Sequence, residues 1–145
     1  MWRINLAITI GLVACHPAMM SDLESIRDYI DDTRRETNRH LDAARAARTM
    51  QDMQREMIQH RDGMAPVMFD IDVGMDGMTS HCDGAGLADM QAMHNELDGE
   101  MAQHASLMDA IIELPGAVVE TERHVSMMIA TMDGMDGAME RMHCR

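Results

Sequence analysis

The chain has 145 residues, enough for one domain with a modest core, and its formal net charge is −13. So acidic a surface argues against nucleic acid and anionic membrane surfaces as partners. Twenty methionines accompany only one Trp, one Tyr and one Phe, which is an unusual composition for a protein core.

The first 14 residues have the features of an export signal. Arg3 gives a minimal positive start, and the mostly apolar run over residues 4–13 is too short for a permanent membrane anchor. The run ends in Leu12-Val13-Ala14-Cys15, which resembles the lipobox of bacterial lipoproteins. The resemblance implies cleavage before Cys15, its lipidation and a place in the cell envelope, at the periplasmic face of the outer membrane. The alternative is an ordinary secretory signal that is cleaved nearby.

We expect residues 15–20 to form a tether and residues 21–144 a helical domain. Ser21 and Glu24 have the spacing of a capping box, which predicts that the first helix begins there. Its inward positions alternate at intervals of three and four, as in helices that pack at shallow angles. These positions are Leu23, Ile26, Ile30, Thr33, Thr37, His40, Ala44 and Ala47.

The end of the first helix allows two interpretations. We expect a break near Arg48, where Thr49 and Asp52 could cap a second helix. In the alternative, the first helix continues to Arg61 and turns at the glycine and proline that follow. A second helix that continues to residue 82 should be kinked at Pro66, because proline removes a backbone hydrogen bond.

The second half begins after a turn at residues 83–86. The third helix has the clearest heptad pattern, at Leu87, Met90, His94, Leu97, Met101, His104, Met108 and Ile111. Pro115-Gly116 should end it, and we expect the fourth helix from Ala117 to Met142. Four helices of similar length with short connections predict an all-α, antiparallel up-down four-helix bundle.

The two halves are related by an offset of 64 residues. His60, Met64, Met68, Ile71, Met75 and Met78 correspond to His124, Met128, Met132, Met135, Met139 and Met142. The matches fall on helix-spaced positions, so we interpret the chain as a duplicated helical hairpin with repeats at 22–83 and 86–145.

Four histidines occupy the same inward position of the heptads, and each follows a glutamate by four residues. The pairs are Glu36 and His40, Glu56 and His60, Glu100 and His104, and Glu120 and His124. One helical turn separates the members, so we expect each carboxylate beside its own imidazole, in a supporting role. All four histidines should lie in nearby layers of the bundle. The alternative is a set of ordinary surface Glu–His pairs.

Methionine at nearly every inward position of two helices favours a soft metal ion. Thioethers are neutral ligands that suit Cu(I) and bind Zn(II), Mg(II) or Ca(II) poorly. The alternative is a methionine-rich core or an adaptable binding groove. The candidate metal ligands are His60, Met64, Met68, Met75, Met78, Met101, His104, Met108, His124, Met128, Met132, Met135, Met139 and Met142, with His40 supporting.

Across residues 22–144 the chain resembles exported Met- and His-rich helical proteins of bacterial copper handling, and copper-storage four-helix bundles. The resemblance implies storage or buffering of several Cu(I) ions, or of Ag(I). Storage bundles of the best-known type use cysteines, whereas this chain has methionine and histidine. Alternatives are a non-metal role, as an oxidant sink or partner surface, and a His/Glu di-metal or haem redox protein. We find no enzymatic motif and expect no catalysis.

The remaining cysteines occur in matching dipeptides, His81-Cys82 and His143-Cys144. Both should lie at the end of the bundle opposite the histidine layer. In an oxidising compartment we expect a disulfide between them. The alternative is a reduced site in which these four side chains bind Cu(I) or Zn(II).

Overall fold

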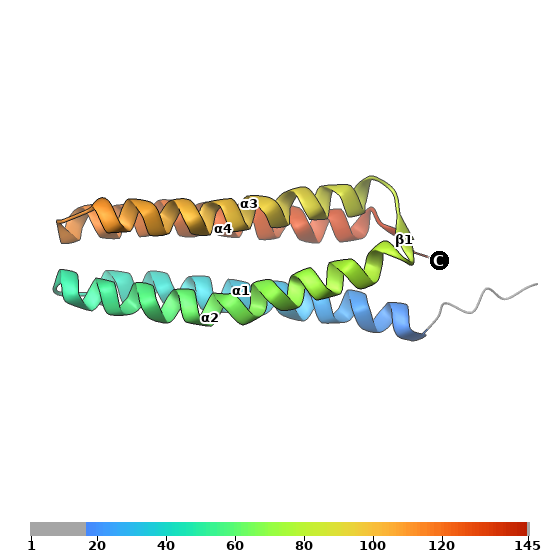
Figure 1. Cartoon of the computed structure of the whole chain (residues 1–145), viewed down its shortest axis with the longest axis horizontal. Coiled ribbons are helices and arrows are strands. Elements are labelled where there is room, and N and C mark those ends of the chain that lie inside the picture. Colours follow the sequence, from blue (N-terminus) through green and yellow to red (C-terminus); the bar gives the residue numbers. More distant parts are fainter. Residues whose placement is uncertain (1–16, 145) are drawn as a thin grey trace, which may run out of the picture.

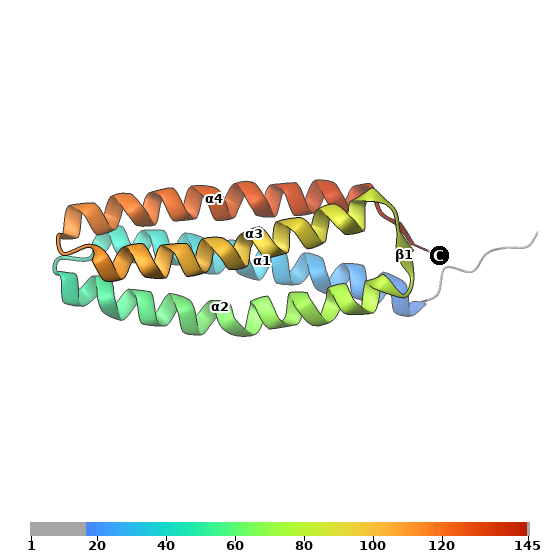
Figure 2. The ribbon, with the colours of Figure 1, turned by 45° about the horizontal axis from the view of Figure 1, so that its top comes forward.

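Four long helices follow one another along residues 17–144, the part of the chain that this computed structural model describes. They are α1 (Pro17–Ala46), α2 (Met50–Thr79), α3 (Ala85–Ala110) and α4 (Leu114–Glu140). Successive helices run in opposite directions, which confirms the antiparallel up-down four-helix bundle (Figures 1 and 2). The expected export signal and Cys15 lie outside the described residues.

The bundle consists of two hairpins that meet along one side. Helix α1 packs along α2, and α3 packs along α4, which gives the two layers of Figure 1. The hairpins meet mainly through α1 and α4, where Arg34 forms salt bridges with Asp133 and Asp136 and Arg45 with Glu122. Helices α2 and α3 make few contacts. The bundle is therefore closed on its α1–α4 side and parted on its α2–α3 side.

The break near Arg48 is confirmed, and the longer first helix is wrong. The Thr49 hydroxyl accepts a hydrogen bond from the backbone N–H of Asp52, whose carboxylate accepts one from the N–H of Thr49. This reciprocal cap fixes the start of α2 without any Gly or Pro in the turn. Helix α2 then continues through Pro66 and is bowed along its length, not broken there (Figure 2).

Two expected helix starts were wrong. Helix α1 begins at Pro17 and not at Ser21, so residues 17–20 belong to the helix and not to a tether. Helix α4 begins at Leu114, with Pro115 in its first turn. Proline is tolerated in a first turn because the N–H that it lacks has no helical partner there, so Pro17 and Pro115 each lie in the first turn of a helix.

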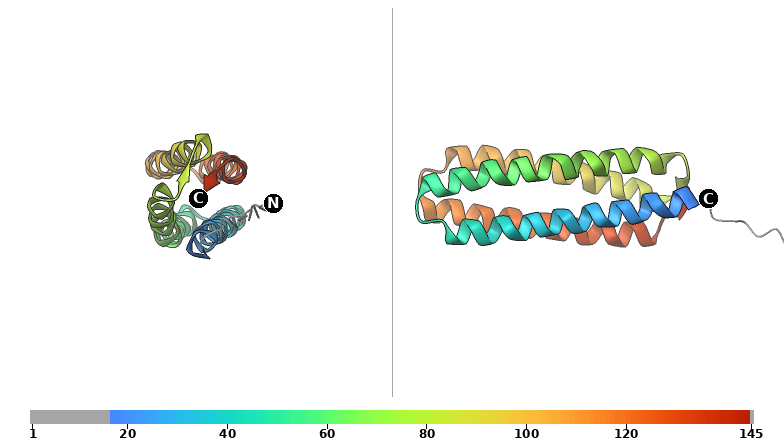
Figure 3. Two further views of the ribbon diagram at one scale, coloured as in Figure 1. Left: turned by 90° about the vertical axis from the view of Figure 1, so that its right-hand side faces the viewer. Right: turned by 90° about the horizontal axis from the view of Figure 1, so that it is seen from below.

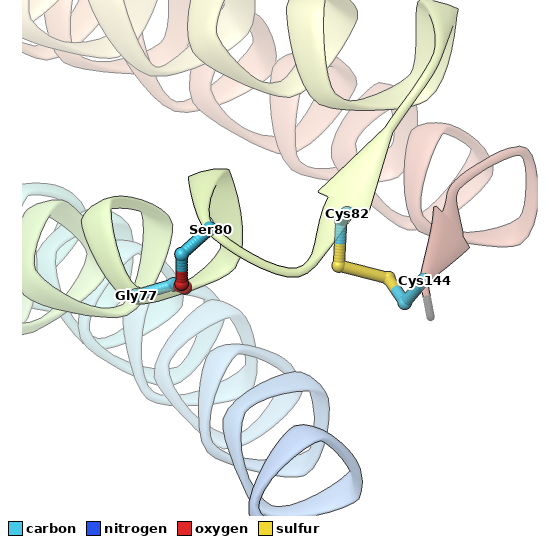
Figure 4. Close-up of a disulfide and its surroundings, with 4 residues drawn as sticks. All are labelled: Gly77, Ser80, Cys82 and Cys144. Carbon is cyan, nitrogen blue, oxygen red and sulfur yellow. A yellow bond between two sulfur atoms is a disulfide. The ribbon is translucent and has the colours of Figure 1, made fainter. Parts of the chain in front are cut away.

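The far end of the bundle carries a short feature that the sequence did not predict. Strands β1 (Cys82–Asp83) and β2 (His143–Cys144) pair antiparallel, and Cys82 lies opposite Cys144. The two cysteines form a disulfide that joins the hairpins (Figure 4). An end-on view places β1 across the end of the bundle (Figure 3).

The core is divided into two apolar clusters. The larger cluster lies toward the disulfide, and nine of its fifteen buried residues are methionines, such as Met64 and Met128. The smaller cluster lies at the opposite end and contains Ala44, Met53 and Met108. No described helix is both long enough and apolar enough to cross a membrane.

Candidate metal centre

A layer of four histidines separates the two apolar clusters, and each helix contributes one of them. The side chains of His40, His60, His104 and His124 are at most 1% exposed. Within each hairpin the two rings are stacked, with centroids 3.9 Å apart for His40 and His60 and 4.0 Å apart for His104 and His124. The expected grouping of the four histidines is confirmed, and His40 is an equal member of this histidine tetrad.

Across the hairpins the imidazoles face each other through their Nε2 atoms. The Nε2 atoms of His40 and His104 lie 3.4 Å apart, as do those of His60 and His124. The facing rings are inclined at 76° and 78°. Each facing pair joins positions 64 residues apart, so the tetrad has the same geometry in both halves. The duplication itself stays a prediction.

Each imidazole Nδ1 is bonded to a carboxylate, but not to the one that we expected. Glu56 contacts His40 at 3.0 Å, and Glu36 contacts His60 at 3.3 Å. Each glutamate thus contacts the histidine of the other helix in its hairpin. The second hairpin has the same crossed pairing, with Glu120 on His104 at 3.2 Å and Glu100 on His124 at 3.0 Å. The expectation that each glutamate lies beside its own histidine is therefore wrong. Inward histidines on neighbouring helices lie closer to the partner helix's carboxylate than to their own.

Gly63 makes room for one of these carboxylates. A Cβ atom at this position would lie 3.0 Å from the carboxyl carbon of Glu36. The alternative interpretation of the sequence placed this glycine in a turn, whereas it lies inside α2 and against the carboxylate that holds His60. Its small size is therefore explained by packing.

Two arginines hold the carboxylates from outside. Arg39 donates hydrogen bonds to Glu36 and Glu56, with its shortest contacts at 2.6 and 2.8 Å. Arg123 donates to Glu100 and Glu120, at 2.6 and 2.7 Å.

The sequence did not reveal this role. Arg39 lies outside the inward positions of the first helix, and the offset of 64 replaces Arg39 by Gln103 and Arg123 by Gln59. The arginines therefore depart from the repeat and could not be found through it.

These contacts determine which ring nitrogen carries the proton. A carboxylate can only accept, so each Nδ1 must be the N–H donor. In a neutral imidazole the other nitrogen, Nε2, is then an acceptor with a free lone pair. Two acceptors therefore face each other at 3.4 Å in each pair, and either a proton that one ring takes up or a bound metal ion would satisfy both.

Burial keeps the imidazoles neutral. Burial lowers the pKa of all four histidines. Burial together with the neighbouring imidazoles lowers the pKa of His60 to about 2 and that of His124 to about 4. Burial would raise the pKa of Glu100, but hydrogen bonds from Arg123 and His124 lower it overall. Hydrogen bonds from Arg123 likewise lower the pKa of Glu120.

The layer as a whole is negatively charged. Four carboxylates and two guanidiniums surround four neutral imidazoles, which leaves two net negative charges. Among residues 17–144, no group of three or more His, Cys, Asp or Glu side chains is placed so that it could hold a metal ion in this arrangement. The imidazole nitrogens meet instead as two facing pairs that surround one small region.

Most of the other candidate ligands lie in the core. Nine of the expected methionines are buried: Met64, Met68, Met75, Met78, Met108, Met128, Met132, Met135 and Met139. Met101 and Met142 are half-buried. The candidate set omitted the buried Met53, Met90 and His94. The Nδ1 atom of His94 lies 3.4 Å from Asp72, and its Nε2 makes no hydrogen bond within the described part of the chain.

The second candidate site is a disulfide in this structure. Cys82 and Cys144 are bonded to each other, so neither sulfur is a thiolate ligand. His81 is exposed. The expected disulfide is confirmed, and the alternative of a His/Cys metal site requires its reduction.

No family model matches the chain, and no curated protein or solved structure matches it.

Proposed function

We propose that this protein binds transition-metal ions inside its bundle, with Cu(I) as the principal cargo, and buffers or stores them. One observation carries the proposal. Two buried pairs of imidazole Nε2 atoms face each other at 3.4 Å, while every Nδ1 is occupied by a carboxylate. Imidazoles whose second nitrogen is held by a carboxylate are fixed in tautomer and orientation and are stronger donors to a metal.

The separation of the facing nitrogens fits a tetrahedral ion. Nitrogen ligands that lie about 2.0–2.1 Å from a metal have tetrahedral edges of roughly 3.3–3.4 Å. The two nitrogens of each facing pair have this separation, and the two ring planes within each pair are inclined at 76° and 78°. Small shifts of the stacked rings would complete the four-coordinate shell. The two net negative charges of the layer favour one divalent ion or two monovalent ions.

The thioethers would take further ions. Met64 and Met128 lie one helical turn beyond His60 and His124 and are at most 1% exposed. Imidazole suits copper and zinc alike, but thioether favours Cu(I), and Ag(I) is a similarly soft ion. A core with so many buried thioethers supports copper over other metals and supports more than one bound ion.

Zinc is the second candidate cargo. The tetrad presents nitrogen donors without sulfur, each backed by a carboxylate, and its charge matches one divalent ion. On this alternative the methionines only fill volume.

Other classes of function are less well supported. The carboxylates contact the Nδ1 atoms from outside, so they are placed to orient the histidines and not to bridge a di-metal centre. A haem between the two histidines of one facing pair would need the space that the other facing pair occupies. Each ring of one facing pair is stacked on a ring of the other, with centroids 3.9–4.0 Å apart. Most of the inward methionines are buried, so they offer little surface to a partner helix or an oxidant.

An anaerobic competition titration tests the proposal. Wild-type protein is titrated with Cu(I) against a chromogenic chelator, and in parallel with Zn(II) against a zinc indicator. The variant His60→Gln/His124→Gln removes one facing pair, and the exposed His81→Gln is the matched control. We expect wild-type protein to bind several Cu(I) per chain. The affinity for the tightest ion should fall at least tenfold in the double variant and should stay unchanged in the control.

Three other results are informative. Tight binding of one Zn(II) with weak Cu(I) would favour the zinc alternative. Wild-type protein that retains neither metal would contradict the proposal. So would an equal affinity in the double variant and the control.

A further inference from the structure

A groove runs between α2 and α3 on the parted side of the bundle and reaches the tetrad. Its volume is about 890 Å³, and both His60 and His104 line it, whereas His40 and His124 do not. These two histidines belong to different facing pairs. One nitrogen-bearing ring of each pair is therefore reached from the same side.

Five methionines line this groove. Met50, Met53 and Met57 come from α2, and Met101 and Met108 from α3. Met53 and Met108 are buried, and the other three are half-buried. Thioethers thus line both walls, from the half-exposed rim to the histidines.

The opposite side of the bundle provides an internal comparison. The offset of 64 relates the α2–α3 side to the α4–α1 side, and there the five methionines are replaced by Leu114, Ala117, Thr121, Thr37 and Ala44. That side is packed closed and is bridged by Arg34 and Arg45. The thioethers therefore accompany the opening and are not demanded by the repeat.

We infer that the groove methionines Met50, Met53, Met57, Met101 and Met108 form a binding site for a soft monovalent ion, Cu(I) or Ag(I). From this site the ion passes to Nε2 of His60 and His104. The inference rests on the proposed function and adds where the cargo is received. Thioethers need no deprotonation and hold soft ions exchangeably, which suits a receiving site. The transfer exchanges sulfur–metal bonds for nitrogen–metal bonds, with no change in oxidation state and no proton released.

The size of the groove agrees with this role. A volume of about 890 Å³ is far more than a bare ion needs, and it admits an ion together with ligands of a carrier. Ile58 and Ile112 also line the groove and are 51% and 85% exposed. A second copy of the chain seated on these residues is the competing occupant, and the test below distinguishes it.

Methionine methyl NMR with Ag(I) identifies the first thioethers that bind an ion. Ag(I) is diamagnetic and soft, so stepwise addition to ¹³C-methyl-methionine protein reports each thioether separately. Once the tetrad holds one Ag(I), we expect the groove methyls to shift next, before those of the larger core cluster. Shifts confined to the core methyls would overturn the inference. So would groove methyl positions that depend on protein concentration and not on Ag(I), because a second copy would then fill the groove.

Stopped-flow uptake of Cu(I) from a weak chelator tests the transfer. The variant Met57→Leu/Met101→Leu keeps the volume of the groove wall and removes two half-buried thioethers. Met93→Leu/Met127→Leu is the matched control, because these methionines lie outside the groove and the candidate ligands. We expect the groove variant to fill the tetrad about tenfold more slowly than wild type, and the control to fill it at the wild-type rate.

The outcomes separate the two proposals. Normal binding with an unchanged rate in the groove variant would overturn the receiving site alone. Equal slowing in the control would also overturn it. Wild-type protein that binds no ion at equilibrium would overturn the proposed function together with this inference.

Discussion

The Nε2 atoms of His40 and His104 face each other at 3.4 Å in a layer of histidines that are at most 1% exposed, although the two residues come from different hairpins. Each carries a carboxylate on its other nitrogen, so neither can donate to its neighbour while both are neutral. An ion bound between them would tie the hairpins together and stabilise the folded bundle through binding linkage. The predictions below follow from this arrangement.

The metal-free protein should contain four histidines in the Nδ1–H tautomer. Glutamates accept from His40, His60, His104 and His124 at Nδ1, which leaves each Nε2 unprotonated. Long-range ¹H–¹⁵N NMR at neutral pH distinguishes the two tautomers of each ring. The exposed His81 serves as the internal reference. An Nε2–H signal from both members of a facing pair would contradict the arrangement.

Metal-free protein should lose stability as the pH falls below about 6.5. Burial lowers the folded-state pKa of the tetrad, to about 4 for His124, whereas an unfolded histidine titrates near 6.5. The stabilisation is therefore complete above about pH 6.5 and decreases as the unfolded chain takes up protons that the fold excludes. Each such histidine contributes a slope of about 1.4 kcal/mol per pH unit.

Urea unfolding between pH 7.5 and 4.5, with a metal chelator present, measures this dependence. The variant His60→Gln/His124→Gln should have a shallower slope than wild type, whereas His81→Gln should keep the wild-type slope. A wild-type free energy of unfolding that stays constant from pH 7 to pH 5 would show that the four histidines are not held neutral.

Removing the charge of one carboxylate should weaken metal binding without removing a ligand. In Glu100→Gln the amide oxygen can still accept from Nδ1 of His124, but the charge that strengthens the imidazole as a donor is lost. We expect affinity to fall about 10–100-fold, as for other residues that orient metal ligands. Glu96→Gln, one turn earlier on the exposed face of α3, is the matched control. An equal affinity in both variants would mean that the carboxylate has no role in binding.

The disulfide should stabilise the bundle without affecting the tetrad. Cys82 and Cys144 are separated by 62 residues, and closing a loop of that length contributes roughly 4 kcal/mol in the chain-entropy treatment. Cys82→Ala/Cys144→Ala should therefore unfold at lower urea concentration, by about 2–4 kcal/mol, and should become insensitive to reductant. Its Cu(I) affinity should match that of wild type, because the disulfide lies at the far end of the bundle. Loss of metal binding in this variant would place the site at the cysteines.

Heptad spacing was sufficient to predict the fold and the histidine layer from the sequence. The inward positions of His40, His60, His104 and His124 follow from intervals of three and four, and short connections place them at one level. Helix starts were less predictable, because proline is as compatible with a first turn as with a break. Pro17 and Pro115 both lie in the first turn of a helix, where the sequence favoured later starts.

The connections within the site depend on contacts between helices that no single-helix pattern contains. A glutamate four residues before a histidine can reach its own ring or the ring of the neighbouring helix, and only packing decides between them. For this reason Glu36 contacts His60 and Glu56 contacts His40, each on the neighbouring helix. Arg39 donates hydrogen bonds to both carboxylates. The groove was also unpredictable, because Met57 and Met101 look like any inward methionines until α2 and α3 are seen to part.

X-ray absorption spectroscopy on protein loaded with one equivalent of metal tests the central claim most directly. It should be recorded for Cu(I) and for Zn(II) on wild-type protein under anaerobic conditions. We predict a first shell of imidazole nitrogen without sulfur, at about 2.0–2.1 Å for Zn(II). Sulfur should enter the Cu(I) spectrum only with later equivalents. A first equivalent bound by sulfur or by carboxylate oxygen alone would contradict the assignment of the histidine tetrad as the metal centre.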